Sequence, residues 1–451
     1  MEDLHPLETI MRREIDEIKN SPPKVVTWDY DVILHVTTPA GIVDIPVLML
    51  NSIQTLRDYV TRFGDVISIQ VAIPLGAAVH VLFPWHYQFE ATVIKSPLAT
   101  AAVYNPIEEQ PSRAIRYTGK LYDIKDALLE SKRMEMAAMS GSNDTDFITV
   151  DIQLISPLLE DIRVKTFGGI VRDSNAIDAI VSILMNYSGT IKGVTVEQDY
   201  KPGAEQHIVI PHNTRLVNLP KVVNQLVGGI YPTGFRYYLQ RDMWYIYSPY
   251  NVDRYDTAFK TATIINMPKE KLSEMEVTFR LTPTQIILLS TGDTQHLDTT
   301  ERAAQTLGNG VRFVDASQVI DGFGKVFDNK FVVERPTNVV EAVNSKQQRK
   351  VDYAPESDVR ITNSYNLEWS EFARRAGKIV QVHWESSEVD HLYPGIPIRF
   401  MWMDGDTAKQ MYGRLLSAET ASKQTNRSVK KKIHTNDTIL TVFLSKHSKE
   451  V

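Results

Sequence analysis

Short runs in which apolar and polar residues alternate constrain the fold of this sequence most. Within residues 66–73, the apolar positions Ile67, Ile69, Val71 and Ile73 are separated by single residues. Because side chains of a β-strand point alternately to the two faces of a sheet, this spacing predicts a strand. Proline and glycine separate this run from similar ones, which is typical of turns between strands. The sequence therefore predicts a chain built largely from short β-strands.

The predicted strands fall into two parts of the chain, one near each end. Before residue 125 they cover 30–36, 42–50, 66–73, 79–83 and 87–94, with one short helix at 53–63. A strand is also predicted at 147–155, and later ones at 275–281, 286–290, 378–384, 398–403, 410–416 and 438–444. The polar and basic residues 421–437 predict a long loop between the last two strands. Many short strands with few helices favour a barrel or a sandwich in each part.

Helical periodicity marks the N-terminus and the middle of the chain. Residues 7–18 carry an apolar stripe at helical spacing, and 173–188 form a capped amphipathic helix. A helix at 219–227 ends at two glycines, and an aromatic β-hairpin follows at 235–247. This hairpin is interpreted mainly as core, with a partner-binding face as the alternative.

These patterns predict an α+β chain that is predominantly β, with two β units flanking an α+β insertion. The predicted division is an N-terminal helix at 1–23, a first β domain at 24–125, a connector and strand at 126–164, the insertion at 165–270, and a second β domain at 271–451. A helix is expected at 123–139, where the connector begins.

Composition excludes several classes of protein. The chain of 451 residues contains no cysteine, which removes disulfides, thiolate metal sites and cysteine nucleophiles. Its formal net charge of −6 gives no electrostatic case for a dedicated nucleic-acid-binding protein. No run of about 20 apolar residues is present, so no membrane span is expected.

No catalytic, cofactor-binding or metal-binding motif is found, and the sequence predicts a protein that is not an enzyme and has no cofactor. The acidic pairs are expected to be solvated surface residues: Glu108–Glu109, Asp352 with Glu356, and Glu385 with Glu388. Two alternatives stay open. One is a hydrolase on a β scaffold, for which the candidates are His80, His86, Glu385 and His391. The other is a nucleic-acid-handling factor that uses the basic loop 423–434, with Lys430, Lys431 and Lys432.

The middle region resembles that of a known family. A helix, a short helix ending near Tyr231-Pro232 and Gly234, and an aromatic hairpin with Asp242 and Tyr245 follow one another at about 170–250. This order is similar to the inner region of central baseplate (tail) hub proteins of contractile-tailed phages. The flanking β regions fit that family only in their pattern of strands beside proline and aromatic residues.

The resemblance implies two β-barrel domains of the tail-tube fold, and a ring-shaped trimer that joins a sixfold tail tube to a threefold central spike. It implies as partners the tail tube protein, the spike and other baseplate subunits, with DNA only in transit through a central channel. The expected location is the virion tail baseplate, assembled in the host cytoplasm; a hub of a phage-like contractile injection system is the related alternative. The aromatic candidates for subunit or partner contacts are Trp85, Tyr87, Tyr231, Phe400 and Trp402.

Overall fold

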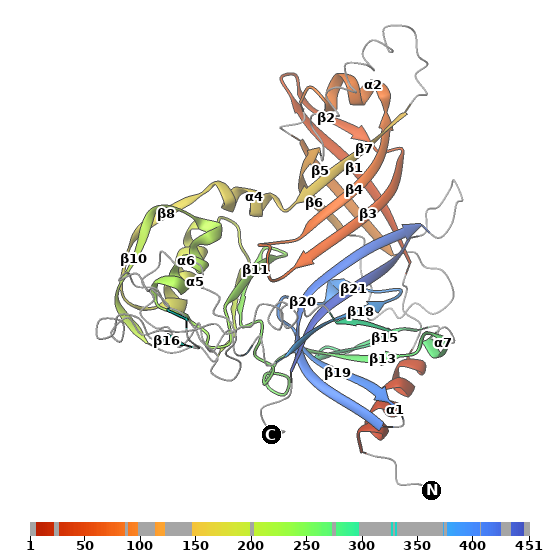
Figure 1. Ribbon diagram of the computed structural model, residues 1–451. Helices are drawn as coiled ribbons and strands as arrows, with labels where there is room; N and C mark the ends of the chain where they lie inside the picture. Colours follow the sequence, from red (N-terminus) through yellow and green to blue (C-terminus); the bar gives the residue numbers. More distant parts are fainter. Residues whose placement is uncertain are drawn as a thin grey trace.

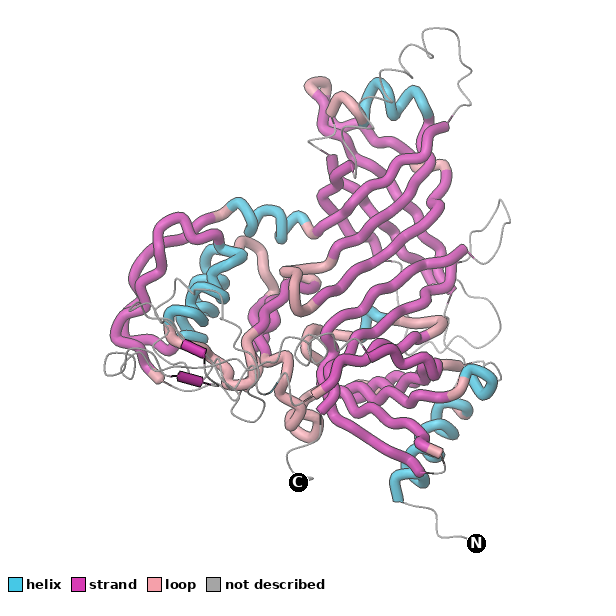
Figure 2. The backbone as a smooth tube through the Cα atoms, in the orientation of Figure 1, coloured by secondary structure: helices cyan, strands magenta, loops and turns pink. Residues whose placement is uncertain are grey.

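The architecture consists of two β-barrels and an α+β unit beside them (Figure 1). The computed structural model describes residues 6–21, 27–85, 89–97, 113–121, 147–198, 203–272, 277–296, 326–327, 330–331, 373, 377–405, 407–424 and 434–445. Strands make up most of this traced chain, and helices lie at the periphery and in the α+β unit (Figure 2).

The first barrel closes through a ring of antiparallel pairings, in the order β3–β4–β7–β6–β5–β1–β21–β20 and back to β3. Its strands are β1 (Thr27–Thr38), β3 (Met49–Asp58), β4 (Val66–Pro74), β5 (Phe89–Pro97), β6 (Arg113–Leu121), β7 (Phe147–Ile155), and parts of β20 (Thr407–Gln424) and β21 (His434–Ser445). Strand β2 (Gly41–Pro46) pairs with β1 outside the ring. Apolar side chains fill the barrel, and Leu34, Val71 and Leu154 are fully buried.

A short helical segment covers one end of this barrel (Figure 1). It consists of α2 (Leu75–Ala77) and the π-helix η1 (Ala78–Leu82). Ala78 and Leu82 are fully buried and belong to the barrel core, so this segment closes the interior against water at that end.

The second barrel closes through β13–β19–β20–β21–β18–β15 and back to β13. Its further strands are β13 (Thr261–Met267), β15 (Gln285–His296), β18 (Lys378–Trp384) and β19 (Pro397–Asp404), with β14 (Phe279–Leu281) paired to β15. The helices α1 (Pro6–Lys19) and α7 (Lys269–Leu272) lie against it (Figure 1). Met11 and Ile18 of α1 pack with Ile265, Leu289 and Met401 of the barrel, so the predicted stripe of α1 is its packing face.

The two barrels share the hairpin of β20 and β21. Strand β20 pairs with β19 up to Arg414 and with β3 from Ser417 onward. A register shift between Leu415 and Ser417 lies at the crossing point, where a bulge bends the strand from one barrel into the other. The carbonyl of Leu416 in the bulge accepts a 2.9 Å hydrogen bond from the amide of Tyr59. Both barrels are therefore built on the same two continuous strands.

The α+β unit contains helices between a two-stranded ribbon and a three-stranded sheet. Its elements are α4 (Pro157–Val164), β8 (Thr166–Asn175), α5 (Ala176–Tyr187), β9 (Gly193–Val196), β10 (Ala204–Arg215), η3 (Leu216–Asn218), α6 (Leu219–Leu226), β11 (Arg236–Gln240) and β12 (Met243–Tyr247). The remaining elements of the described chain are β16 (Val326–Phe327), β17 (Lys330–Phe331) and the 3₁₀ turn η4 (Val389–His391).

The aromatic hairpin β11–β12 packs on both of its faces. Tyr237 and Trp244 belong to the core of the α+β unit, whereas Tyr238 and Tyr247 belong to the core of the second barrel. Arg241 and Asp242 make its turn with positive φ values of 53° and 63°, as the tightest hairpin turns require. Its interpretation as mainly core is confirmed.

The predicted fold class is confirmed: the chain is α+β and predominantly β, with two barrels around an α+β insertion in sequence order. The helices at the N-terminus, at 173–188 and at 219–227 are confirmed as α1, α5 and α6. The helix expected at 123–139 lies outside the described residues. No helix in the traced ranges combines the length and the apolar character that a membrane span needs.

Three local predictions are wrong. Residues 53–63 are not a helix: they include most of strand β3, whose buried residues Ile53 and Arg57 are four positions apart, a spacing that fits a helix as well as a strand. Residues 79–83 are helical where a strand was predicted, because Ala78 and Leu82, four positions apart, both pack into the core at the end of the barrel. Both ends of the loop predicted at 421–437 are strand, since β20 extends to Gln424 and β21 begins at His434.

Candidate functional site

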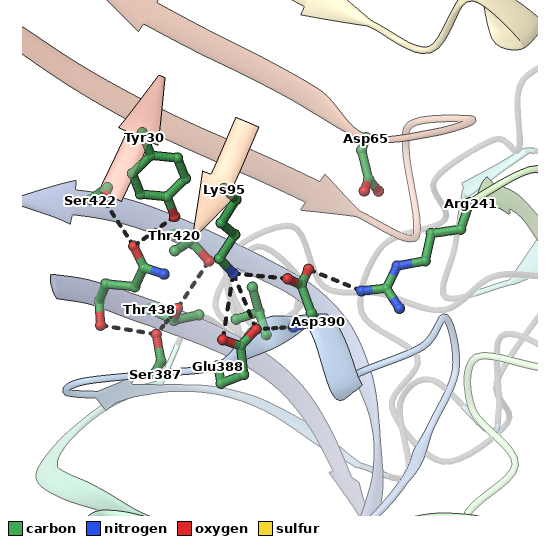
Figure 3. A network of polar contacts seen from close by, with 12 residues as sticks. Tyr30, Asp65, Lys95, Arg241, Ser387, Glu388, Asp390, Thr420, Ser422 and Thr438 are labelled. Carbon is green, nitrogen blue, oxygen red and sulfur yellow. Dashed lines mark hydrogen bonds and ion pairs between the residues drawn. The ribbon is translucent and has the colours of Figure 1, made fainter. Parts of the chain in front are cut away.

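A buried charge network lies where the two barrels and the α+β unit meet (Figure 3). Its centre is Asp390 on η4. One carboxylate oxygen of Asp390 lies 3.0 Å from Arg57 of β3 and 3.0 Å from Arg241 of the hairpin turn. The other oxygen lies 2.8 Å from Lys95 of β5. Two strands of the first barrel and the hairpin turn of the α+β unit thus each place a cation on one carboxylate.

The neighbours of Asp390 extend this network. Arg57 also binds Asp65 at 3.2 Å and donates a 2.7 Å hydrogen bond to the carbonyl of Val389. Lys95 binds Glu388 at 3.3 Å and lies 3.9 Å above the ring centre of Trp28. The residues are shielded from water, with side-chain exposures of 8% for Arg57 and 16% for Lys95.

The pKa values of Asp390 and Glu388 are shifted in opposite directions. Burial would raise the pKa of Asp390, but Lys95, Arg57 and Arg241 outweigh burial and hold this pKa well below its usual range. Burial, followed by the charge of Asp390, raises the pKa of Glu388 to about 7. Asp390 therefore carries the permanent negative charge, and Glu388 is the carboxyl that gains or loses a proton near neutral pH.

A pKa near 7 would suit an acid–base catalyst, but the setting of Glu388 points elsewhere. The residue is 5% exposed, and both carboxylate oxygens lie within 3.4 Å of Lys95. This geometry can hold the barrels and the α+β unit in one orientation. If the units moved apart, the charged side chains would lose partners while still buried, which is unfavourable.

A second buried ion pair connects the α+β unit to the shared hairpin. Arg414 of β20 binds Glu197, next to β9, at 2.7 Å, and the two side chains are 3% and 8% exposed. The Nε and Nη1 atoms of Arg414 donate to the carbonyls of Asn251 and Gly395, both at 2.5 Å. The guanidinium is therefore tied to three separate segments of the chain.

Buried polar residues also connect the strands of the shared hairpin. Thr420 and Thr438 contact each other at 2.9 Å, and the hydroxyl of Ser422 donates a 2.8 Å bond to Asn436 (Figure 3). The polar side chains that made this segment look like a loop are therefore satisfied across the hairpin.

The five aromatic residues predicted at an interface lie in different environments. Trp85 is 39% exposed at the end of the first barrel, and Trp402 is half-buried on β19. Tyr231 and Phe400 are buried within the chain, and the hydroxyl of Tyr231 donates to the carbonyl of Glu197 at 2.6 Å. Tyr87 lies outside the described residues. The interface role of these residues stays a prediction.

The residues proposed for a hydrolase are spread over the fold. His80 is on η1 of the first barrel, whereas Glu385 and His391 follow β18 in the second, and His86 is outside the described residues. Within the described ranges, no group of three or more histidine, aspartate or glutamate side chains is placed to hold a metal ion. Most of the basic loop 423–434 also lies outside these ranges.

The network itself was missed from the sequence, and the surface assignment of Glu388 was wrong. Glu108, Glu109, Asp352 and Glu356 lie outside the described residues. The partners in the network are separated by hundreds of positions, such as 333 between Arg57 and Asp390. The available signal was weak: Lys95 ends an apolar strand run, and Arg57 lies within another.

The fold and the candidate site together define a protein of two barrels fused through one hairpin, in which buried ion pairs connect the barrels and the α+β unit.

No protein-family model matches the chain, and no curated protein sequence does. In fold it is similar to a tail protein from Neisseria meningitidis MC58, at 8% identity over 92% of this chain and 96% of that chain, with a TM-score of 0.44. It is also similar to the 43 kDa tail protein of prophage MuSo2 from Shewanella oneidensis, at 9% identity over 92% and 99%, with a TM-score of 0.42.

A third similar structure is the E. coli c3393 protein, described as a component of the type VI secretion system. It is 8% identical over 90% of this chain and 75% of that chain, with a TM-score of 0.41. The three structures named here are described as two tail proteins and a secretion-system component. At these sequence identities the comparison concerns the fold alone and not the function.

Proposed function

We propose that this chain is a non-enzymatic structural subunit of a contractile phage tail, the hub of the baseplate, or its counterpart in a phage-like injection system. The observation that carries the proposal is the closure of two barrels on one shared hairpin, β20–β21. A ring of three such chains would present six barrels, which is how a threefold spike could meet a sixfold tube. The resemblance at 170–250 supports the same role.

The buried charge network supports this proposal because such a hub must keep its barrels in fixed relative positions. Asp390 binds cations from the first barrel and from the α+β unit at distances of 2.8–3.0 Å. Breaking a buried pair of this kind costs about 3–5 kcal/mol, so the relative orientation of the units is strongly favoured.

The proposed partners are two further copies of the chain, the tail tube protein, the central spike and other baseplate subunits. DNA would pass through the channel of the ring without sequence-specific contacts. The proposed location is the virion tail baseplate, with assembly in the host cytoplasm. The proposed units follow the division at 23, 125, 164 and 270, except that β7 belongs to the first barrel and β13 to the second, and β20 and β21 serve both barrels.

The test is the solution mass of the purified full chain, together with negative-stain images of the same particles. A trimer of about 153 kDa, three times the 51.1 kDa chain, with a central channel is expected. A 51.1 kDa monomer without a ring at every concentration would overturn the proposed trimer.

A pair of variants can test the proposed contact surface. Trp85→Ser should shift the trimer toward monomer, because Trp85 is a partly exposed aromatic residue at the end of the first barrel. Phe259→Ser is the matched control, since Phe259 is 85% exposed beside the second barrel. Equal dissociation of both variants, or of neither, would contradict the role of Trp85.

A further inference from the structure

A pocket of ≈ 490 Å³ lies between the aromatic hairpin and the segment that connects β18 to β19. Tyr245 of β12 stacks on Tyr393 across this junction, with ring centres 6.1 Å apart and planes at 24°. The hydroxyl of Tyr393 donates a 2.6 Å bond to the carbonyl of Lys260, which fixes the segment before β13 against the pocket. The α+β unit and the second barrel both contribute to its walls.

The pocket has an excess of positive charge. Four of its lining residues are cationic and two are carboxylates: Arg241, Arg254, Lys260 and Arg414 against Glu197 and Asp390. The carboxylates are already occupied, because Arg414 lies 2.7 Å from Glu197 and Arg241 lies 3.0 Å from Asp390. They therefore leave cationic charge in the pocket uncompensated.

Lys260 carries much of this uncompensated charge. No carboxylate among the described residues lies within ion-pair distance of its ammonium group, although the side chain is half-buried. Burial, followed by the charge of Arg241, lowers the pKa of Lys260. A carboxylate placed between Lys260 and Arg241 would relieve both effects.

The rim of the pocket adds an apolar contact to this cationic centre. Phe259, next to Lys260, also lines the pocket and is 85% exposed. Strand β9, whose residues Thr195 and Val196 line the pocket, pairs only with β12 within the described chain. An extended peptide could therefore lie beside β9 with an apolar side chain on Phe259.

We propose that this pocket binds an acidic, extended segment of a partner protein, with a carboxylate between Lys260 and Arg241 and an apolar side chain against Phe259. The occupant is a peptide and not a small anion, because the apolar rim and the edge of β9, unpaired within the described residues, extend beyond the reach of a single carboxylate. Since Arg241 also binds Asp390, the bound segment would contact the network that ties the units together. This proposal is independent of the hub role.

The test measures binding of a short fluorescent peptide of alternating glutamate and phenylalanine to the purified full chain. A counterpart with glutamine in place of glutamate reports the contribution of charge, and glutarate as competitor reports binding of a free carboxylate. We expect the acidic peptide to bind about tenfold more tightly than its counterpart, since charged hydrogen bonds are the stronger ones. Glutarate should displace it only at far higher concentration.

Variants assign the binding to this pocket. Lys260→Gln should weaken binding of the acidic peptide about tenfold, and Phe259→Ser should weaken binding of both peptides. Lys221→Gln is the matched control, because Lys221 is an exposed lysine on α6 outside the pocket. Solution mass and melting temperature of each variant show that assembly and folding are retained.

Three results would overturn the proposal. They are equal binding of the two peptides, equal loss of binding in Lys260→Gln and Lys221→Gln, and displacement by glutarate at the concentration of the peptide. The last result would make the pocket a site for small anions.

Discussion

Replacing Glu388 with glutamine is expected to make the protein more stable at pH 8 and to leave its stability nearly unchanged at pH 5. Glutamine has the shape of the protonated carboxyl and cannot ionise. In the native chain, burial and then the charge of Asp390 raise the pKa of Glu388 from the ordinary 4.5 to about 7. The wild-type side chain must therefore lose its proton, at a cost in stability, as the pH rises.

The size of the effect follows from this shift. Each pKa unit corresponds to about 1.4 kcal/mol, so a rise from 4.5 to about 7 amounts to about 3 kcal/mol. A carboxyl whose pKa is raised on folding contributes fully below pH 4.5, and its contribution is lost as the pH rises through 7. The glutamine variant should thus gain up to about 3 kcal/mol over wild type between pH 5 and pH 8.

The measurement is urea unfolding of both proteins at pH 5, 6, 7 and 8, followed by tryptophan fluorescence. Asp390→Asn is the matched control in the same network. Because cations hold the pKa of Asp390 well below its usual range, its stabilising contribution is present throughout these pH values. That variant should lose about 3–5 kcal/mol at each pH, since Arg57, Lys95 and Arg241 would lose the carboxylate that they share.

One result would refute this reasoning. If Glu388→Gln destabilised the protein equally at pH 5 and pH 8, Glu388 would be ionised in the folded chain at both values. The carboxylate would then be a favourable partner of Lys95 and not a group that burial protonates.

Three further predictions concern positions where the units meet, and each is measured by urea unfolding. Gly395→Ala should destabilise the protein by more than about 2 kcal/mol, because Gly395 has φ +69° and an added Cβ would lie 2.3 Å from the ring of Tyr247; a loss below about 1 kcal/mol would mean that the ring moves aside. Tyr247→Phe should cost about 1–2 kcal/mol, since its hydroxyl donates a buried 2.7 Å bond to the carbonyl of Tyr59, and no change would show that another donor replaces it. Arg399→Gln should cost about 3 kcal/mol, because the buried carboxylate of Glu14 on α1 would lose its ion-pair partner. Stability should recover partly in the double variant with Glu14→Gln. Additive losses in the double variant would contradict the pairing.

Local patterns in the sequence predict the elements whose burial follows a regular period. The apolar stripe of α1, the amphipathic α5 and the aromatic hairpin were predicted because each buries a face at its own helical or strand spacing. Strand β3 was partly missed because its buried residues Ile53 and Arg57 are four positions apart, which fits a helix as well as a strand, and because its register shifts between Leu50 and Ser52. A regular burial period can be predicted from the sequence of the element itself, whereas a register shift depends on the neighbouring strand.

The shared hairpin and the charge network were decided only by the tertiary structure. Nothing local in β20 predicts that one strand completes two barrels, because β3, its partner in the first barrel, is distant in sequence. The same holds for Glu388, which local sequence assigns to the surface and the fold places against Lys95. The sequence by itself determined elements with regular burial, such as α1, α5 and the hairpin β11–β12, through side-chain periodicity. Long-range packing determined which polar groups lost contact with water and therefore had to find each other.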